Sequence, residues 1–539
     1  MDCLTSIPSE VPWQVGRLLS SVAELEGRAV TMSESSDHSQ HYRPEGDARP
    51  KRTVSEAEIR GSLNRLIANG ITTFTSYYTF EGLDSEQLSR LNTWVGRCCT
   101  LLKGGHQVTD LAVVYPSDTM QARLAPSDLW VKDAPPEAQQ VQDSYDQASR
   151  ALFGDARDFT YVDAQALSEA VVADGTMTLG DLSWRLIILP CVDTLPLRAW
   201  EHLAALWRSG GGVIALGAIP ANSENEFPSP LVREVAHELF ADDASGEIRT
   251  NAAGGFALYL GAGQQGLLTT GVNAFLAPDA ILPKGAPLHV THRRIEEHEL
   301  FFVINDSADA WSGNLGISAA EDGEEWNPLT GEHTAISDPK AIALQLEPYG
   351  GMLFRFSNAE TPEKHSPVAG ILPGLEPRTL TATAPTLGKG EFVEATVAAA
   401  AEAGPWTASA TLTKGDTDTF LFLTFSWPED MDLSNDECLR FDLDVTERQE
   451  CGQKLLAIVR DVHGVEYLCD TQVRLDIPGA TRAFVPLKSF TRAGWCAAPE
   501  SALDWSKIRD IRMGWGGYMG HEGEKISFRT SMPGVAGKL

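Results

Sequence analysis

The chain has 539 residues and a mass of 58.4 kDa, which at about 150 residues per domain suggests roughly three or four domains. Lys and Arg number 43 against 74 Asp and Glu, so the formal net charge is −31. A polyanion of this size repels phosphate backbones, which excludes nucleic-acid binding as a function. The sequence has no run of about 18 apolar residues that would span a membrane.

The N-terminal residues and the cysteines bear on where the protein works. The first residues lack the basic start and apolar core of a signal peptide, so the sequence predicts a cytoplasmic protein. The eight cysteines include no C-x-x-C pair, which favours reduced, apolar cysteines over a zinc site or a disulfide framework. We therefore expect neither a metal nor a cofactor.

Residues 1–105 alternate helices with short apolar strands, a pattern typical of parallel β/α units. The expected elements are helix 12–26, strand 29–32, helix 53–70, strand 71–75 and helix 85–102. Two such strands predict the end of a (β/α)8 barrel.

Residues 106–280 continue the alternation and predict an open, doubly wound α/β domain of the flavodoxin or amidotransferase type. The expected elements are strand 111–115, helix 139–152, strand 159–162, strand 186–190, helix 197–209 and strand 213–216.

From residue 281 the apolar period changes to two, which indicates antiparallel strands. Residues 281–358 predict a small β-sandwich, and the proline-rich residues 359–379 predict a linker. Residues 380–539 predict a second, jelly-roll-like β-sandwich. The expected fold is therefore α/β plus all-β, in several domains.

The segment after the strand at 29–32 carries the clearest candidate chemistry. Glu34, Asp37 and His38 lie in one polar stretch just past the end of this strand, where barrel enzymes place their catalytic groups. Glycoside hydrolysis uses two carboxylates that flank the sugar bond, one as nucleophile or base and one as acid. The segment predicts that Glu34 is one of them; the alternative is a solvated loop glutamate.

Aromatic residues supply two further candidates for sugar contact. Tyr77 and Tyr78 end the strand that begins at 71, where their rings can stack on a sugar or pack against the rim. Trp515 and Tyr518 flank two glycines in the C-terminal sandwich and predict a second stacking platform. For Trp515 the alternative is a ring buried between two sheets.

Two motifs match known sites but lack their context. Residues 261–266 read G-x-G-x-x-G, yet they come late in the α/β domain and no helix and acidic strand end follow, so a dinucleotide site is not expected. Cys191 follows a strand at the position of an amidotransferase nucleophile. It lacks the glycines of a sharp nucleophile turn, so we expect a structural cysteine.

The order of these parts resembles multidomain glycoside hydrolases built like the family 42 β-galactosidases, and related architectures occur in other barrel glycosidases, including the rhamnosidase type. In that family a glutamate on barrel strand seven is the nucleophile. Residues 31–34 look like the end of strand seven, and residues 71–78 look like strand eight. The resemblance implies a retaining glycosidase with Glu34 as nucleophile. The residues that would shape its sugar subsite are Asp37, His38, Tyr77 and Tyr78.

The resemblance covers residues 12–358, and residues 508–528 look like the last strands of a carbohydrate-binding sandwich. It implies a carbohydrate substrate and a homotrimer formed through the amidotransferase-like domain. A complete barrel needs about 250 residues, whereas only residues 1–105 precede that domain. We therefore expect the C-terminal part of a longer enzyme, without the strand-four acid that would partner Glu34. The rival hypothesis is a non-catalytic carbohydrate-binding or assembly protein.

Overall fold

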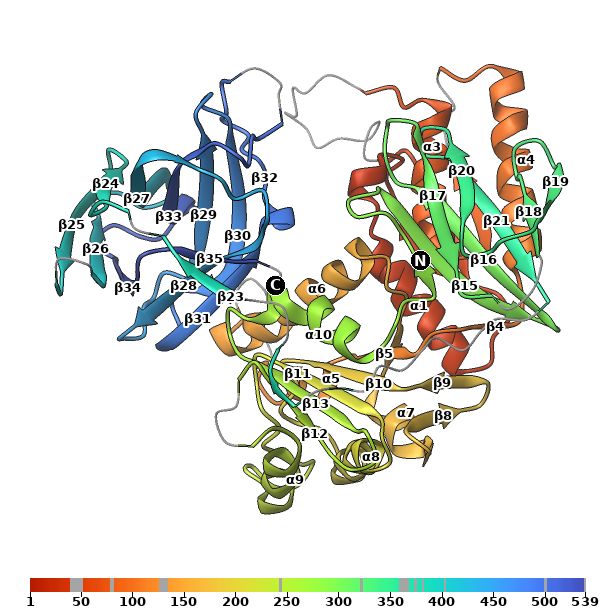
Figure 1. Ribbon diagram of the computed structural model, residues 1–539, viewed down its shortest axis with the longest axis horizontal. Helices are drawn as coiled ribbons and strands as arrows, with labels where there is room; N and C mark the ends of the chain where they lie inside the picture. Colours follow the sequence, from red (N-terminus) through yellow and green to blue (C-terminus); the bar gives the residue numbers. More distant parts are fainter. Residues whose placement is uncertain are drawn as a thin grey trace.

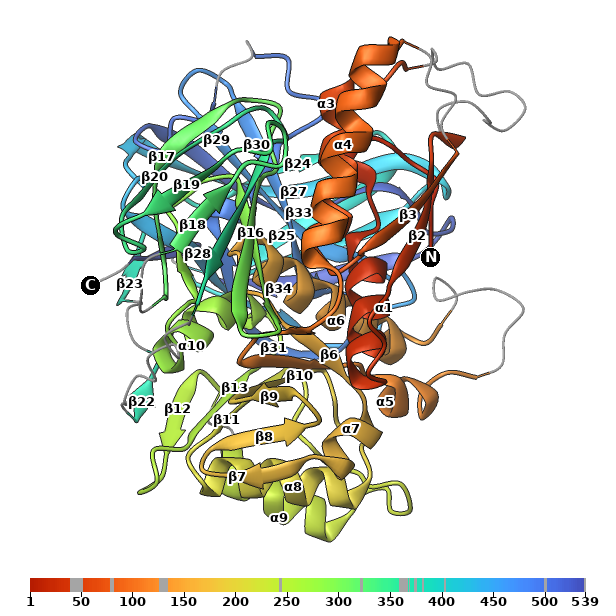
Figure 2. The same ribbon diagram turned by 90° about the vertical axis from the view of Figure 1, so that its right-hand side faces the viewer.

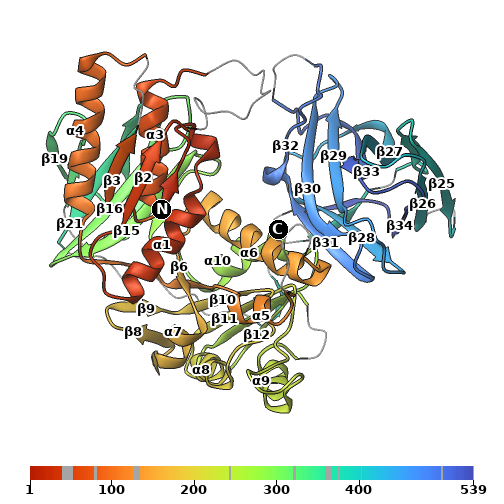
Figure 3. The same cartoon turned by 180° about the vertical axis from the view of Figure 1, so that it is seen from behind.

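The computed structural model describes residues 1–38, 52–77, 82–125, 134–241, 245–319, 323–357, 367, 369–372, 376–380, 382–401, 404–498 and 502–537. Over these residues the chain combines parallel β/α sheets with two antiparallel β-sandwiches, so the expected mixed α/β and β-rich fold is confirmed (Figure 1). Figures 1 and 3 show the C-terminal sandwich on one side of helix α6 (Pro136–Gly154) and the N-terminal elements on the other.

The first part of the chain forms a three-stranded parallel sheet in the order of the sequence. Its elements are β1 (Asp2–Cys3), η1 (Pro8–Glu10), α1 (Trp13–Leu25), β2 (Met32–Ser36), α3 (Glu56–Ala68), β3 (Thr73–Tyr77) and α4 (Ser85–Leu102). Ser55 and Asp84 begin α3 and α4 with capping boxes, which fix where both helices start. The sequence analysis did not predict β1, because two residues carry no readable strand pattern.

The two faces of this sheet have different environments. Asp2, Glu34 and Thr75 are in register across the three strands and therefore share one face, on which Asp2 and Thr75 are exposed. Cys3 and Ser35 point to the opposite face and are each 1 % exposed. Figure 2 shows α1, α3 and α4 together on one side of β2 and β3. The described residues thus cover one face of the sheet and leave most of the other face open, although Ser36 on that face is 1 % exposed. We call this second face the bare face.

A doubly wound α/β unit follows. Its elements are β5 (Leu111–Val114), α5 (Ser117–Gln121), α6, β6 (Thr160–Val162), α7 (Ala164–Glu169), β7 (Val171–Ala173), β8 (Thr176–Leu179), β9 (Leu182–Trp184), β10 (Leu186–Pro190), α8 (Leu197–Arg208), β11 (Gly212–Leu216), α9 (Pro230–Phe240), β12 (Glu247–Thr250), β13 (Phe256–Leu260), η3 (Gln265–Leu267) and α10 (Leu268–Phe275). The short strands β7, β8 and β9 form a separate sheet beside the main one. The parallel order β6-β5-β10-β11-β13 is the flavodoxin-like arrangement. All residues of β5, β10 and β11 are buried, which explains their continuous apolar sequences.

A small β-sandwich packs against α3 and α4. Its strands are β4 (His106–Gln107), β14 (Ala280–Ile281), β15 (Leu288–Ile295), β16 (His298–Asn305), β17 (Trp311–Ile317), β18 (Gly323–Trp326), β19 (His333–Ile336), β20 (Ile342–Leu346) and β21 (Gly351–Phe356). One sheet has the order β19-β18-β21-β16-β15-β4, and the other has the order β14-β17-β20. Trp94 and Cys98 of α4 meet Phe302 of β16 in one apolar cluster, which joins this sandwich to the N-terminal helices.

The remaining strands build the C-terminal sandwich, apart from the first of them, which joins the doubly wound sheet. They are β22 (Gly370–Ile371), β23 (Glu376–Thr379), β24 (Thr386–Lys389), β25 (Val393–Ala399), β26 (Trp406–Leu412), β27 (Thr417–Met431), β28 (Asp436–Val445), β29 (Lys454–Asp461), β30 (Glu466–Arg474), β31 (Gly479–Pro486), β32 (Thr491–Arg492), β33 (Ile508–Met519), β34 (Lys525–Thr530) and β35 (Gly534–Gly537), with η4 (Leu487–Ser489). Two of these strands lie in residues 359–379, which were expected to be a linker. β22 pairs with β12 of the doubly wound sheet, and β23 pairs with β35 of the sandwich.

The C-terminal sandwich docks on the doubly wound unit through close backbone contact and charge pairs. A Cβ atom at Gly263 would lie 2.6 Å from Thr481, and one at Gly266 would lie 2.6 Å from the Phe484 carbonyl oxygen. The glycines of the G-x-G-x-x-G motif therefore let β31 approach the turn before α10. Basic residues of the sandwich also meet carboxylates on and just after α6. These pairs are Arg448–Glu137, Lys454–Asp143, Arg474–Asp143 and Lys488–Asp155.

Candidate functional site

Glu34 lies at the centre of β2, not beyond the strand end as the sequence analysis expected. Its side chain is half-buried on the bare face of the sheet. The register places Asp2 of β1 on one side of it and Thr75 of β3 on the other, at the spacing of about 4.8 Å that separates neighbouring strands. The sheet thus brings two carboxylates together on one accessible face. Asp2 could not be recognised from the sequence, because the two-residue strand β1 has no pattern that predicts it.

The other residues expected around Glu34 lie at the carboxyl ends of β2 and β3. Tyr77 is the last residue of β3 and is 54 % exposed on the same face as Glu34. Asp37 directly follows β2 but is only 5 % exposed. His38 is exposed, and its Nδ1 lies 3.0 Å from the Ser36 hydroxyl oxygen. Tyr78 lies outside the described residues.

The proposed platform of the C-terminal sandwich divides into a buried and an exposed ring. Trp515 is 0 % exposed and belongs to the apolar core between the two sheets, so it offers no surface to a sugar. It is therefore the buried ring that the sequence left open as the alternative. Tyr518, on the same strand, is 78 % exposed. Neighbouring positions of β33 point to opposite faces, and the three-residue separation places the two side chains on different sides of the sheet.

The carboxyl ends of the doubly wound strands, where such folds often bind ligands, are filled by protein side chains between β5 and β10. Arg123 makes a bidentate ion pair with Asp193, which follows β10, and Thr119 accepts hydrogen bonds from the backbone N–H groups of Asp193 and Thr194. Cys191 adopts a φ of +50° as a nucleophile turn would, but it is 2 % exposed and burial raises the pKa of its thiol to about 12. A buried, protonated thiol fits the expected structural cysteine.

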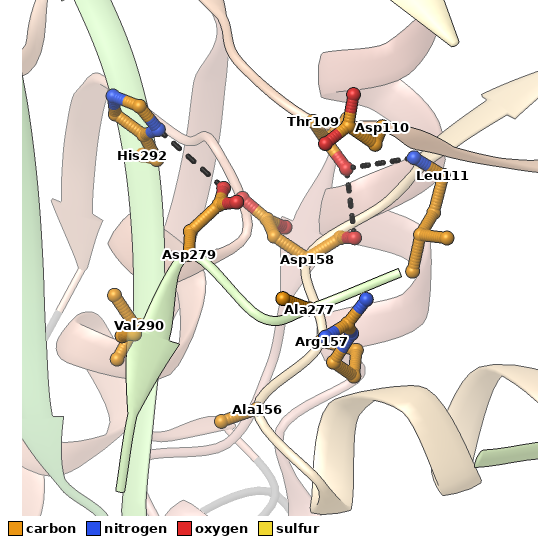
Figure 4. A pocket seen from close by; sticks show the side chains of 11 residues that line it. Thr109, Asp110, Leu111, Ala156, Arg157, Asp158, Ala277, Asp279, Val290 and His292 are labelled. Atoms are coloured by element: carbon orange, nitrogen blue, oxygen red, sulfur yellow. Dashed lines mark hydrogen bonds and ion pairs between the residues drawn. The ribbon is translucent and has the colours of Figure 1, made fainter. Parts of the chain in front are cut away.

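A polar cavity of about 30 Å³ lies where the doubly wound unit meets the small sandwich (Figure 4). Its charged lining residues are Asp110, Arg157, Asp158, Asp279 and His292. Arg185 pairs with Asp110, and Arg17 of α1 pairs with Asp158 at 2.6 Å, so two of the three aspartates are already neutralised. This volume accommodates water but no sugar ring. We interpret the cavity as part of the junction between units rather than as a substrate pocket.

His292 is the titratable centre of this junction. Its Nε2 lies 2.9 Å from a Glu299 oxygen, and its Nδ1 lies 3.5 Å from an Asp279 oxygen. Burial by itself lowers the pKa of His292, but the two carboxylates outweigh burial and raise the pKa above its ordinary value. In the described ranges no group of three or more His, Cys, Asp or Glu side chains is arranged to hold a metal ion.

The comparisons with known proteins agree with a glycosidase. Residues 59–339, more than half of the chain, match the family described as alpha-L-rhamnosidase, glycoside hydrolase family 106. The chain therefore belongs to this family of glycoside hydrolases. A search of the curated proteins found no match. None of the described helices is long and apolar enough to cross a membrane.

The solved structures similar to this chain include proteins of three kinds. A rhamnosidase from Novosphingobium sp. PP1Y is 13 % identical over 95 % of this chain and 48 % of its own length, with a TM-score of 0.42. A β-galactosidase from Bacillus circulans sp. alkalophilus is 12 % identical over 64 % of this chain and 58 % of its own, with a TM-score of 0.45. A family 11 carbohydrate-binding module from Clostridium thermocellum is 17 % identical over 31 % of this chain and 96 % of its own, with a TM-score of 0.24. The chain thus spans about half the length of that rhamnosidase.

Proposed function

We propose that this chain is part of a glycoside hydrolase that cleaves α-L-rhamnosides, and that Glu34 supplies one of its two carboxylates. The observation that carries the proposal is the position of Glu34 on the bare face of a parallel sheet, in a chain of the α-L-rhamnosidase family. Tyr77 on the same face would stack on the sugar, and Asp37 and His38 would border the subsite.

The open sheet supports a role as part of a barrel. Parallel sheets are stable when both faces are covered, and unpaired strand edges invite further pairing. We propose that β1, β2 and β3 are consecutive strands of a (β/α)8 barrel whose other strands close over Glu34. Either Asp2 or a carboxylate on another barrel strand then serves as the acid. The resemblance to family 42 predicts retention of anomeric configuration, which requires the two carboxyl groups to be about 5 to 5.5 Å apart.

The test uses Glu34→Gln in the complete enzyme, with Glu26→Gln at the exposed end of α1 as a matched control. We expect Glu34→Gln to lower kcat on 4-nitrophenyl α-L-rhamnopyranoside by about 10³-fold or more, because a neutral amide is neither nucleophile nor base. The control should retain normal turnover. Activity of Glu34→Gln within tenfold of the wild type would remove Glu34 from the reaction.

Two further measurements define the reaction. Turnover of 4-nitrophenyl β-D-galactopyranoside instead of the rhamnoside would establish the β-galactosidase-like specificity implied by the sequence resemblance. Proton NMR of the first-formed anomer decides between retention and inversion. In a retaining enzyme, azide should restore turnover of Glu34→Ala and give a glycosyl azide of inverted configuration if Glu34 is the nucleophile.

The second candidate function is carbohydrate binding without catalysis. It is favoured by Tyr518, whose ring is 78 % exposed on the C-terminal sandwich. If the complete protein binds oligosaccharides but hydrolyses none of the aryl glycosides, this second function replaces the first. The trimer implied by the resemblance stays a prediction, and light scattering of the purified protein tests it.

A further inference from the structure

Trp495 differs from the other tryptophans in the described ranges, because it alone is exposed, with 57 % of its surface accessible. It lies in a turn that follows β32, on the sheet β24-β27-β33-β29-β30-β32 of the C-terminal sandwich (Figure 1). A single exposed apolar ring is ordinary on a protein surface, so the contacts that hold this ring in place decide whether it can act as a binding site.

The turn that carries Trp495 is held at both ends. The backbone N–H of Cys496 donates to the carbonyl oxygen of Ala493 at 3.0 Å, which closes a four-residue turn. The N–H of Ala493 donates to the carbonyl oxygen of Glu466 at 2.9 Å, and the N–H of Glu466 donates to the sulfur of Cys496 at 3.4 Å. The turn is therefore fixed to the first residue of β30.

A chain of charged side chains orients the indole ring itself. Trp495 Nε1 donates to a Glu466 carboxylate oxygen at 2.8 Å, and Arg512 contacts the other Glu466 oxygen at 2.9 Å. Arg512 and Arg460 both pair with Asp510, whose side chain is 1 % exposed. A buried carboxylate thus anchors two partly exposed guanidinium groups, and one of these holds the glutamate that fixes the ring.

We propose that Trp495 is the stacking platform of a glycan-binding site on the C-terminal sandwich, and that it takes one pyranose ring of a neutral carbohydrate chain. An indole held in place loses little conformational entropy when an apolar sugar face stacks on it. Glu466 accepts and the two arginines donate hydrogen bonds, which is the chemistry that sugar hydroxyls need at the edge of a stacked ring. The proposal rests on the proposed function only in that this protein acts on glycans.

The arrangement favours a sugar over other occupants. A nucleic acid would meet a chain of net charge −31. The polar groups that contact the ring are charged and paired with one another, which favours a partner rich in hydroxyl groups over an apolar protein surface. This site also differs from the platform predicted from the sequence, because Trp515 is buried and Trp495 is not.

Calorimetric titration of the full chain tests the proposal with two probes: methyl α-L-rhamnopyranoside and a β-1,3-1,4-mixed-linked glucan tetrasaccharide. We expect the wild type to bind at least one probe with a Kd of about 0.1 to 1 mM. Trp495→Ala should weaken that binding by tenfold or more, and Glu466→Gln should weaken it by a smaller factor, since the ring stays but loses its anchor. Phe420→Ala, which removes another exposed ring of the same sandwich, is the matched control and should bind like the wild type. Tyr518→Ala tests the platform predicted from the sequence.

Thermal unfolding of each variant accompanies the titrations, because an exposed ring contributes little to the core and Trp495→Ala should melt with the wild type. If Trp495→Ala melts at a lower temperature than the wild type, the affinity of Glu466→Gln for the probe becomes the deciding measurement. The proposal is overturned if the wild type binds neither probe at 10 mM, if Trp495→Ala binds as tightly as the wild type, or if only Tyr518→Ala loses binding. None of these results affects the proposed catalytic role of Glu34, which is tested by the hydrolysis of aryl glycosides.

Discussion

The molecule contains two parallel sheets made from the same β/α alternation, and they differ in what covers them. In the doubly wound unit, every residue of β10 and β11 is buried, with helices on both faces. In the N-terminal sheet, Met32 is 46 % exposed and Tyr77 is 54 % exposed, although both residues lie in strands that also pair in parallel.

The difference shows in the residues that each strand uses. β10 and β11 consist almost wholly of aliphatic side chains, whereas β2 reads Met-Ser-Glu-Ser-Ser and β3 reads Thr-Phe-Thr-Ser-Tyr. A strand packed between two layers of helices has no place for a carboxylate. Ser33 and Ser35 of β2 point to the covered face and are 0 % and 1 % exposed, so it is the carboxylate of Glu34 that distinguishes the other face, at which we propose that substrate and further strands are received.

The largest expected effect tests whether the doubly wound sheet is the stable part of the molecule. Ile188 is fully buried in β10, and Ile188→Gln would remove its apolar contacts and bury an amide without partners. We expect a loss of about 4 to 5 kcal/mol in the free energy of unfolding, or no folded protein. Urea titration followed by circular dichroism measures it. A loss below about 1 kcal/mol would mean that this sheet is not close-packed.

The next expected effect concerns the contact that joins the two sheets. Arg17 of α1 and Asp158 of the doubly wound unit form an ion pair at 2.6 Å with side chains only 4 % and 9 % exposed. Arg17→Ala leaves Asp158 buried with its charge uncompensated, which should cost about 3 to 5 kcal/mol.

The control for this prediction is Arg208→Ala. Arg208 pairs with Glu238 on the surface of the doubly wound unit, with its side chain 56 % exposed. Solvent screening limits such a pair to less than about 1 kcal/mol. Equal losses in the two variants would show that the junction at Arg17 is solvated and that the two sheets are not rigidly joined.

A smaller effect depends on pH and concerns the junction of the doubly wound unit with the small sandwich. The pKa of His292 is raised in the folded protein, so the stability it contributes is complete below its ordinary pKa of about 6.5 and is lost as the pH rises through the raised value. The free energy of unfolding should therefore decline above about pH 6.5, by about 1.4 kcal/mol for each unit by which the pKa is raised. The charged groups around the ring are Asp279, Glu299, Arg294, Asp110 and Arg157.

His292→Gln removes this titration and is the variant that isolates it. Chemical denaturation at pH 6.0, 7.0 and 8.0 should give a steeper decline for the wild type than for the variant. Parallel curves would assign the pH dependence to other groups.

The sequence predicted the architecture well where one residue pattern extends over a whole element. The buried strands of the doubly wound unit and the helix that begins after Ser55 follow from apolar runs and capping residues. β1 and β4 escaped prediction, because each has two residues and exists only through its neighbours: β1 pairs with β2, and β4 joins β15. Strands of this length are decided by tertiary pairing rather than by local preference.

The candidate site could be predicted in part. The residue types around β2 indicated that Glu34 is one carboxylate of a glycosidase site, but only the strand register places Asp2 beside Glu34. Burial is equally invisible in the sequence: Trp515 and Trp495 are both tryptophans near glycines, yet one is in the core and the other is 57 % exposed. Which ring is exposed depends on the pairing of β33 with β27 and on the hydrogen bond that ties the turn after β32 to Glu466, and both contacts join residues far apart in the sequence.

The smallest expected effect returns to the bare sheet and is matched to the first substitution. Met32→Gln places the same amide on a parallel strand as Ile188→Gln, but on a side chain that is 46 % exposed and on the face shared with Glu34. Since the amide remains in water, we expect a change within about 0.5 kcal/mol in the free energy of unfolding of this chain. If other strands close over this face in the complete enzyme, the same substitution should cost about 2 kcal/mol or more there, because Met32 would then be buried. Urea titration of the two proteins side by side separates the cases, and an equal, small cost in both would show that the face stays open to solvent.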